Sequence, residues 1–275
     1  LMDACDHLQF DITDENVARA RQGYFANISY VDDKIGEILD VLERTRMADN
    51  TVILFVSDHG DMLGERGAWF KMSFLEGSAR VPMMICAPDL EPALYTEPVS
   101  TLDVLPTVCD LAGIDLSEIM EWTDGISLKP LAQGQGRSTP VAMEYAAEGS
   151  YAPMVSLREG RYKLNICALD PDQFFDLEAD PQELVNLAAH TDLSIEQSQA
   201  YGQMRAEAEA RWDLAAFDAE VRQSQARRWI VYEALRNGSY FPWDYQPLKK
   251  ASERYMRNHM DLNILEESQR FPRGE

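Results

Sequence analysis

The fold class of this chain is indicated by a helical pattern that is followed directly by a continuous apolar stretch. Apolar residues recur at steps of three and four from Ile28 to Leu42, which predicts a helix over residues 14–47 with its N-cap at Asp14. Residues 51–56 follow without polar alternation, so they predict a strand that is buried on both faces. A long helix followed by such a strand is typical of an α/β fold built on a parallel sheet.

The rest of the chain predicts a second strand, a smaller sheet and further helices. Residues 81–86 form another apolar run, and a capping box at Ser100 and Asp103 opens a helix that ends before Gly113. Past residue 136 the pattern changes to short strands, followed by helices. The strands are expected at residues 141–145, 154–157 and 162–166, and the helices at residues 194–214, 219–236 and 251–260.

Composition narrows the class of protein. The chain has 25 Lys and Arg against 47 Asp and Glu, a net charge of −22, which argues against a nucleic-acid partner because phosphate binding needs basic residues. The apolar runs are too short to span a membrane. The four cysteines are widely spaced, which predicts free thiols and a cytoplasmic location. The chain opens at Leu1 without a signal pattern, so we expect a fragment of a longer protein.

Two polar residues with metal-binding side chains follow the first predicted strand. Asp58 and His59 stand directly before Gly60, at the carboxyl end of a strand, where ligands collect in open α/β sheets. A carboxylate beside an imidazole is a typical pair of metal ligands. The alternative is a polar turn in which Asp58 caps the backbone and His59 is merely exposed.

Lys71 is a single basic residue among aromatic ones. Trp69, Phe70 and Phe74 flank it, and aromatic surroundings would desolvate the ammonium group and favour contact with an anion. The alternative is a lysine whose stem packs on those rings while its charge stays in water, and this segment taken alone favours that alternative.

The order of these motifs resembles the sulfatases of the alkaline-phosphatase superfamily. Residues 56–67 read VSDHGDMLGERG, followed by Lys71 and by EGSARVP at residues 76–82. LDVLPT at residues 102–107 and FDL at residues 175–177 also fit. This resemblance implies an α/β fold: the C-terminal part of an alkaline-phosphatase-like sandwich with a smaller α+β subdomain and a helical tail.

The last part of the chain is similar to the terminal extension of choline sulfatases. It reads YFPWDYQP at residues 240–247 and SERYMRNHMD at residues 252–261. We therefore expect three parts. Residues 1–138 are expected to be the C-terminal portion of the catalytic domain, residues 139–215 the small subdomain, and residues 216–275 the extension and tail.

The resemblance implies a role for each motif residue. Asp58 and His59 would hold one divalent cation, normally Ca²⁺, with Mg²⁺ or Mn²⁺ as alternatives. His59 stands where many sulfatases have Asn, which leaves the identity of the metal open. Lys71 would hold a sulfate oxygen and neutralise charge on the leaving alkoxide, so that it is both catalytic and substrate-binding.

Acidic and aromatic residues are needed to bind a quaternary ammonium group, which has no hydrogen to donate. The resemblance implies Glu148 and Asp261 for this role, with Asp261 acting across a subunit boundary. For Glu148 the equally favoured alternative is an acidic residue of a surface loop, and Glu144 is a rival for the same role. Trp243 and Tyr245 are candidates for a choline cage, but we favour them as anchors of the tail in an interface.

The expected reaction is hydrolysis of choline-O-sulfate, with the small molecule as the partner and a homo-oligomer formed through the tail. The family nucleophile, a formylglycine made from Cys-x-Pro-Ser-Arg, is not in this sequence. Cys86 begins only an incomplete match and is expected to be a small core residue. We therefore expect these 275 residues alone to be inactive. Alternatives are another sulfatase, a phosphonate or phosphate monoester hydrolase, or a non-catalytic self-associating remnant.

Overall fold

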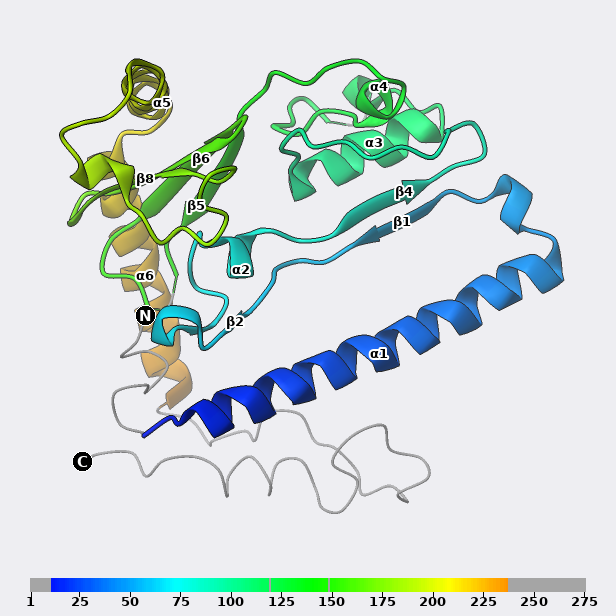
Figure 1. Ribbon diagram of the computed structural model, residues 1–275, viewed down its shortest axis with the longest axis horizontal. Coiled ribbons are helices and arrows are strands. Elements are labelled where there is room, and N and C mark those ends of the chain that lie inside the picture. Colours follow the sequence, from blue (N-terminus) through cyan, green and yellow to red (C-terminus); the bar gives the residue numbers. More distant parts are fainter. Residues whose placement is uncertain (1–10, 119, 148, 237–275) are drawn as a thin grey trace. The chain divides into compact units, whose positions relative to one another are not determined.

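The computed structural model describes residues 11–118, 120–147 and 149–236. Its contacts divide the chain into two compact units, one ending at Val221 and the other beginning at Arg222. The motif residues at positions 57–80 lie in the first unit, which Figure 1 shows as a long helix followed by strands and short helices.

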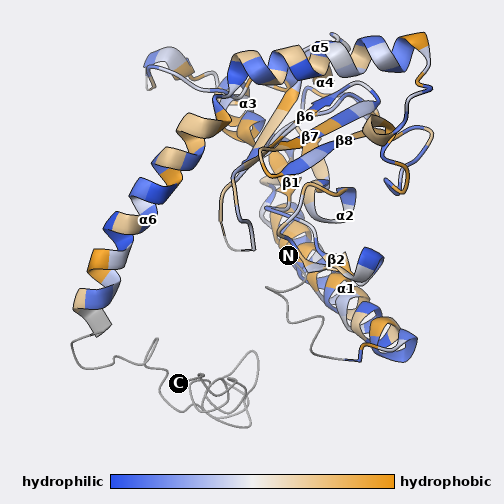
Figure 2. Ribbon diagram, turned by 90° about the vertical axis from the view of Figure 1, so that its left-hand side faces the viewer, coloured by the Kyte–Doolittle hydropathy of each residue, from blue (hydrophilic) through white to orange (hydrophobic). Residues whose placement is uncertain are grey.

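Helix α1 (Asp14–Thr45) confirms the predicted long helix. Its N-cap is Thr13 and not Asp14, because the Thr13 hydroxyl accepts the N–H of Asn16 while the Asn16 side chain accepts the N–H of Thr13. Asp14 lies instead in the first turn, where the helix dipole favours a carboxylate. Apolar and polar residues alternate along this helix in Figure 2, and none of its residues is buried.

Strands β1 (Ile53–Val56) and β4 (Met83–Cys86) pair antiparallel, so the parallel sheet expected from the sequence was wrong for this pair. Parallel neighbours need a long crossover, usually a helix. The connection between these strands contains only short elements: β2 (Met62–Leu63), a 3₁₀ turn (Glu65–Gly67), β3 (Trp69–Phe70) and α2 (Glu76–Ala79).

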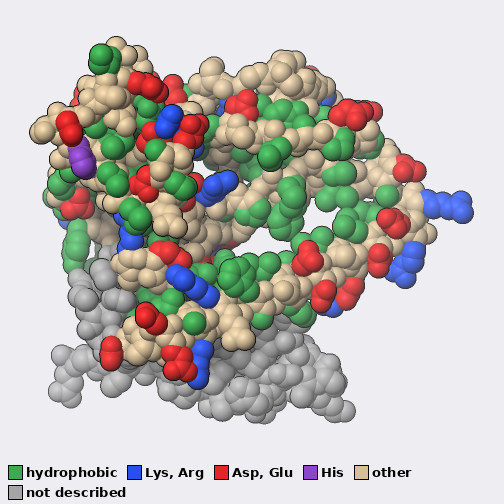
Figure 3. All heavy atoms as spheres, in the orientation of Figure 1, with side chains coloured by type: hydrophobic (Ala, Val, Ile, Leu, Met, Phe, Trp, Pro, Cys, Tyr) green, Lys and Arg blue, Asp and Glu red, His purple; other side chains and the backbone are tan. Residues whose placement is uncertain are grey.

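These two strands are not buried on both faces. Every residue of β1 is half-buried, and exposed residues alternate along β4. Cys86 is exposed at the end of β4, so its expected place in the core was wrong. Figure 3 shows exposed hydrophobic side chains on this part of the molecule. Val31 and Ile38 on α1 and Met84 on β4 are among the exposed apolar residues.

A second group of short helices follows β4. Asp103 closes the predicted capping box with Ser100, at a 3₁₀ turn (Thr101–Asp103) that leads into α3 (Val104–Leu111). Its buried carboxylate also accepts the N–H of Ile126 and pairs with Arg137. Helix α4 (Lys129–Ala132) lies against α3 through the hydrogen bond from the Leu128 N–H to the buried Thr107 hydroxyl.

Four antiparallel strands form the small sheet, in the order β5-β6-β7-β8 (Figure 1). The predicted strands are confirmed as β5 (Val141–Tyr145), β6 (Met154–Glu159) and β7 (Tyr162–Cys167). Strand β8 (Asp170–Asp176) was not predicted, because its first residues are polar and include Pro171. Only its last three residues are buried.

Helix α5 (Ile195–Arg211) covers this sheet and confirms the predicted helix. Met204 and Ala208 pack against core residues of the strands, among them Leu164 and Phe174. Helix α6 (Leu214–Arg236) begins five residues before the predicted start. Within the described residues, no helix combines the length and apolarity that a membrane span requires. The helix expected at residues 251–260 lies outside the described residues.

Candidate functional site

Asp58 lies just past the end of β1, on an exposed turn. Its Oδ1 accepts the N–H of His59 at 2.9 Å, and its side chain is 84% exposed. The hydrogen bond from the His59 N–H lowers the pKa of Asp58, and the imidazole of His59 acts in the same direction. The carboxylate therefore caps the turn and still presents a charged oxygen to solvent.

The hydrogen bonds of His59 fix which ring nitrogen carries the lone pair. Nδ1 lies 3.0 Å from the carbonyl oxygen of Gly60. A carbonyl only accepts hydrogen bonds, so Nδ1 is the donor and the neutral ring keeps its lone pair on Nε2. Nε2 lies 3.4 Å from Oδ2 of Asp58. Histidines that bind metals are held in this way, with the other ring nitrogen donating to a backbone carbonyl.

Lys71 comes to the same place from β3. Its Nζ donates to Nε2 of His59 at 3.0 Å, across twelve residues of sequence. Lys71 is exposed, so its aromatic neighbours do not desolvate it, in line with the alternative that the residues alone favoured. Phe70 is itself 58% exposed and has a left-handed backbone, with φ of 65°. The charge of Lys71 is thus open to an incoming anion.

Helix α2 holds the two motif segments against each other. The N–H of Gly60 donates to the carbonyl of Ser78 at 2.8 Å, and the buried Ser78 hydroxyl donates to the carbonyl of Lys71. A Cβ on Gly60 would collide with the carbonyl oxygen of Gly77. Only glycine fits at position 60, because the backbone of residues 77 and 78 lies where a side chain would begin.

Helix α1 holds the same loop from another side. Arg21 donates to the carbonyl of Leu63 at 3.1 Å and pairs with Glu65 at 2.9 Å. Burial and the neighbouring Asp61 carboxylate raise the pKa of Tyr24. The loop that carries Asp58, His59 and Lys71 is therefore fixed on both flanks.

The residues expected around a quaternary ammonium group are described only in part. Glu144 is the last residue but one of β5, and its Oε1 accepts the indole N–H of Trp212 at 2.6 Å. Glu148, Asp261, Trp243 and Tyr245 lie outside the described residues. Glu144 thus has a structural partner, and the rivalry between Glu144 and Glu148 stays open.

Asp58 and His59 are the two residues here whose side chains could hold a divalent cation. Oδ2 of the exposed Asp58 lies 3.4 Å from Nε2 of the half-buried His59, and a cation at Nε2 would displace the hydrogen bond from Lys71. Within the described residues, no group of three or more His, Cys, Asp or Glu is arranged to hold a metal. The pair fits a metal as part of a coordination shell whose other ligands come from elsewhere.

The side chains that hold these segments were not predicted from the sequence. Ser78 and Glu76 lie inside the EGSARVP stretch but had no role assigned to them. Lys163, which contacts Glu76, lies 87 residues away on β7. No local pattern signals such a contact, since a lysine in a strand is ordinarily a surface residue.

Three models of known protein families match this chain. Residues 6–114 match the family model described as Sulfatase. Residues 64–209, more than half of the chain, match the model described as N-sulphoglucosamine sulphohydrolase, C-terminal. The chain belongs to the sulfatase family. Residues 219–271 of this sulfatase-family chain also match the model described as Choline sulfatase enzyme C terminal.

Curated sulfatases agree with this assignment. The chain is 63% identical to the choline-sulfatase of Rhizobium meliloti (strain 1021), over 100% of the chain and 54% of the relative. It is 32% identical to an arylsulfatase of Clostridium perfringens, over 64% of the chain and 37% of the relative. The chain therefore spans about half the length of the Rhizobium sulfatase and less of the other.

Solved structures confirm the expected α/β sulfatase fold. The phosphonate monoester hydrolase SpPMH from Silicibacter pomeroyi gives a TM-score of 0.63 at 26% identity, covering 74% of this chain and 44% of the other. BT4656, solved in complex with D-glucosamine-2-N,6-O-disulfate, gives a TM-score of 0.60 at 26% identity, covering 70% and 41%.

Proposed function

We propose that this chain is part of a sulfuric ester hydrolase that cleaves choline-O-sulfate to choline and sulfate. The observation that carries the proposal is the 63% identity to the Rhizobium meliloti choline-sulfatase over the whole chain. The meeting of His59 and Lys71 at 3.0 Å supports it, because this contact brings the two sulfatase motifs into one site.

In this proposal Lys71 binds the sulfate group and stabilises the departing alkoxide. Its exposed ammonium can turn from His59 Nε2 to a sulfate oxygen or to the bridging oxygen, where negative charge develops as the S–O bond breaks. Choline is a poor leaving group, so a fixed positive charge beside its oxygen lowers the barrier to S–O cleavage.

Asp58 and His59 are proposed ligands of one divalent cation. Oδ2 of Asp58 and Nε2 of His59 would contact it, and the hydrogen bond from Nδ1 to the Gly60 carbonyl would orient the ring. When bound, the cation would polarise the sulfate and its neighbouring groups. Ca²⁺ is the cation that we propose first. Mg²⁺ and Mn²⁺ are kept as alternatives, because an imidazole ligand suits Ca²⁺ less well than an oxygen ligand does.

The nucleophile is proposed to be a formylglycine that lies outside these 275 residues, which contain no Cys-x-Pro-Ser-Arg motif. The 275 residues alone are then inactive. Glu148 and Asp261 are proposed to bind the quaternary ammonium group. The cytoplasmic location, the homo-oligomer formed through residues 216–275, and the domain bounds stay predictions from the sequence.

The proposal is tested in a hybrid enzyme, which joins this chain to the part of the Rhizobium meliloti choline-sulfatase that it does not match. We expect kcat/KM for choline-O-sulfate to exceed that for an aryl sulfate and for a phosphonate monoester. The structural similarity to SpPMH favours phosphonate monoester hydrolysis as a second candidate. A preference of the hybrid for the phosphonate would establish that candidate instead.

A further inference from the structure

Lys163 is a fully buried lysine on the small sheet, and it reaches the segment that carries Lys71. Its side chain is 0% exposed, yet its ammonium group has three acceptors. Nζ donates to the carbonyl of Phe74 at 2.7 Å, pairs with Glu76 at 2.9 Å, and pairs with Glu183. The buried charge of Lys163 is therefore hydrogen-bonded to one carbonyl and one carboxylate and paired with a second carboxylate.

Glu183 completes the connection from the loop after β8. Its Oε2 accepts the N–H of Glu76 at 2.7 Å while its other oxygen faces Lys163. The Glu183 side chain is 3% exposed, and its backbone is left-handed with φ of 57°. A non-glycine residue keeps such a conformation only where its surroundings demand it. The three residues Lys163, Glu76 and Glu183 are called the buried triad below.

The buried triad connects directly to the candidate site through α2. Glu76 is the first residue of α2, and Ser78 two residues later bonds both motif segments. The Ser78 carbonyl accepts the N–H of Gly60, and the Ser78 hydroxyl donates to the Lys71 carbonyl. Five residues after Lys71, the chain is therefore fixed to the sheet by the carboxylate of Glu76.

Pure stability does not require this arrangement. Burying a lysine with two carboxylates carries a large desolvation cost, and apolar residues of similar size often stabilise a fold as well or better. An ion triad instead specifies one geometry, since each oxygen and each hydrogen needs its own partner. The geometry fixed here is that of the start of α2 against β7.

We propose that Lys163 is a positioning residue that holds α2, through Glu76 and Glu183, so that Lys71 and His59 keep the geometry needed for S–O cleavage. This inference rests on the proposed function of Lys71. A displacement of α2 would move the Ser78 hydroxyl and carbonyl, and with them the backbone of Lys71 and Gly60. Such a displacement would weaken the stabilisation of the leaving-group charge by Lys71, and it would leave the affinity for choline unchanged.

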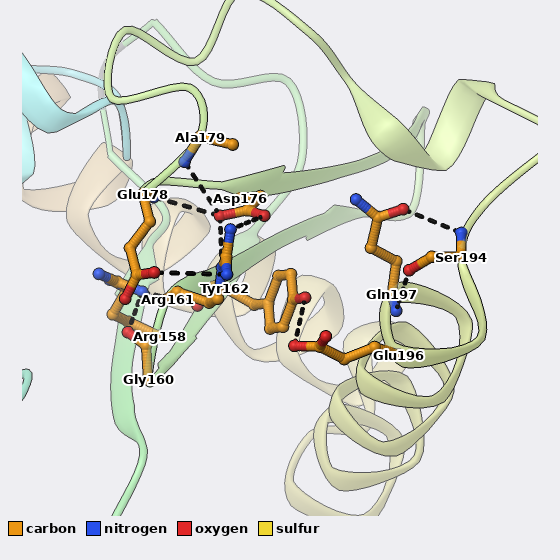
Figure 4. Close-up of polar contacts among 10 residues, drawn as sticks. All are labelled: Arg158, Gly160, Arg161, Tyr162, Asp176, Glu178, Ala179, Ser194, Glu196 and Gln197. Carbon is orange, nitrogen blue, oxygen red and sulfur yellow. Dashed lines mark hydrogen bonds and ion pairs between the residues drawn. The ribbon is translucent and has the colours of Figure 1, made fainter.

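Two variants of the hybrid enzyme test the proposal. Lys163→Met removes the charge and leaves two buried carboxylates. Glu76→Ala is milder, because Lys163 keeps its pairing with the buried Glu183 and the Phe74 carbonyl. The control is Arg161→Met, which breaks the ion pair with Asp176, with bonds of 2.7 and 2.5 Å, two residues from Lys163. Figure 4 shows that the partners of Arg161 all lie on its own sheet and the following loop.

The first measurement is hydrogen exchange of the backbone amides. In Lys163→Met and Glu76→Ala we expect faster exchange in peptides covering residues 57–80, where the Gly60 and Glu76 N–H groups are hydrogen-bonded. Arg161→Met should leave those peptides unchanged. Equal exchange of residues 57–80 in wild type and in both triad variants would contradict the proposal that the buried triad holds α2 in place. This conclusion would stand whether or not the enzyme is a choline sulfatase.

The second measurement separates positioning from general stability, with each variant assayed well below its melting temperature. We expect kcat for choline-O-sulfate to fall about tenfold or more, with KM little changed. The loss on 4-nitrophenyl sulfate, whose leaving group needs little help, should be smaller. Equal losses on both substrates, or equal losses in Arg161→Met, would contradict the positioning role. If the wild-type hybrid does not cleave choline-O-sulfate, the proposed function fails. The exchange result still shows whether the buried triad holds α2 in place.

Discussion

The ammonium nitrogen of Lys71 lies 3.0 Å from Nε2 of His59. The two residues belong to different motifs, one on the turn after β1 and the other just after β3. Because Nδ1 of His59 donates to the Gly60 carbonyl, the lone pair on Nε2 accepts the hydrogen bond from Lys71, and Nε2 is the atom that the proposed cation would contact. The contact thus couples the proposed metal ligand to the proposed sulfate-binding group.

Metal binding is expected to depend on His59. In His59→Ala of the hybrid enzyme, Ca²⁺ and Mn²⁺ affinity should fall by about 10- to 100-fold, since a ligand and its orienting hydrogen bond are both lost. His190→Ala is a matched control, because His190 also faces an aspartate, Asp192, at 3.9 Å. Isothermal titration calorimetry measures both. Equal affinity in wild type and His59→Ala would rule out His59 as a ligand.

Gly60→Ala is expected to damage the site without removing a functional group. The new methyl would meet the carbonyl oxygen of Gly77, which forces α2 away from the turn. Since a displacement of about 1 Å can cost about 100-fold in rate, we expect a loss of that order in kcat/KM. The control is Gly36→Ala, at a position on α1 with nothing within 4 Å of the added methyl.

Gly36→Ala should keep full activity and raise the free energy of unfolding by about 1 kcal/mol, because alanine favours a helix interior over glycine. Steady-state kinetics and thermal melts of both variants check the pair. Unchanged kinetics in Gly60→Ala would show that the backbone approach at Gly77 does not matter for the site.

Stability should depend on pH through Asp176. Burial alone would raise the pKa of Asp176, but hydrogen bonds from Arg161 and from the N–H groups of Ala179 and Glu178 outweigh it and lower the pKa (Figure 4). A carboxyl group with a lowered pKa stabilises the fold above its unfolded pKa of about 3.9, and this contribution is lost as pH falls through the folded pKa.

Melting temperatures of wild type and Arg161→Met should therefore differ most near neutral pH and converge at acidic pH. Arg19→Met is the control, since Arg19 pairs with Glu15 on the exposed surface of α1 at 2.6 Å and such pairs contribute little. A gap between wild type and Arg161→Met that stays constant down to about pH 2, well below the ordinary pKa range of an aspartate, would contradict this.

Choline recognition is expected to involve Glu148 and Asp261. Neutralising either one as Glu148→Gln or Asp261→Asn should raise KM for choline-O-sulfate and spare a neutral aryl sulfate, because only the choline ester carries a quaternary ammonium group. Glu144→Gln is the comparison, since its amide oxygen can still accept the Trp212 N–H. Equal effects on both substrates would make Glu148 and Asp261 structural residues.

Local periodicity predicted much of the fold but not how its parts pair. Helix α1 was predicted from apolar residues at steps of three and four, and strands β5, β6 and β7 from short apolar runs separated by turn residues. The antiparallel pairing of β1 with β4 was missed, since a continuous apolar run does not state its direction. Strand β8 was missed because its polar first half hides the three buried residues that end it.

The sequence predicted which residues make up the candidate site, but not the contacts between them. Asp58, His59 and Lys71 were found from their motifs, and the structure brings them together. Lys163 was not found, because its contact with Glu76 spans 87 residues and its burial reverses the usual place of a lysine. Long-range contacts of charged groups depend on tertiary structure, which no local pattern records.

The most direct test of the account is the rate of choline-O-sulfate hydrolysis by the hybrid enzyme with Lys71→Met. We predict a fall in kcat of about 100- to 1,000-fold, because a charge that stabilises the transition state is removed. Lys129→Met, which breaks the bond of another lysine to Asp110 at 3.0 Å, should keep the wild-type rate. A Lys71→Met enzyme that hydrolyses choline-O-sulfate as fast as wild type would contradict the proposed site.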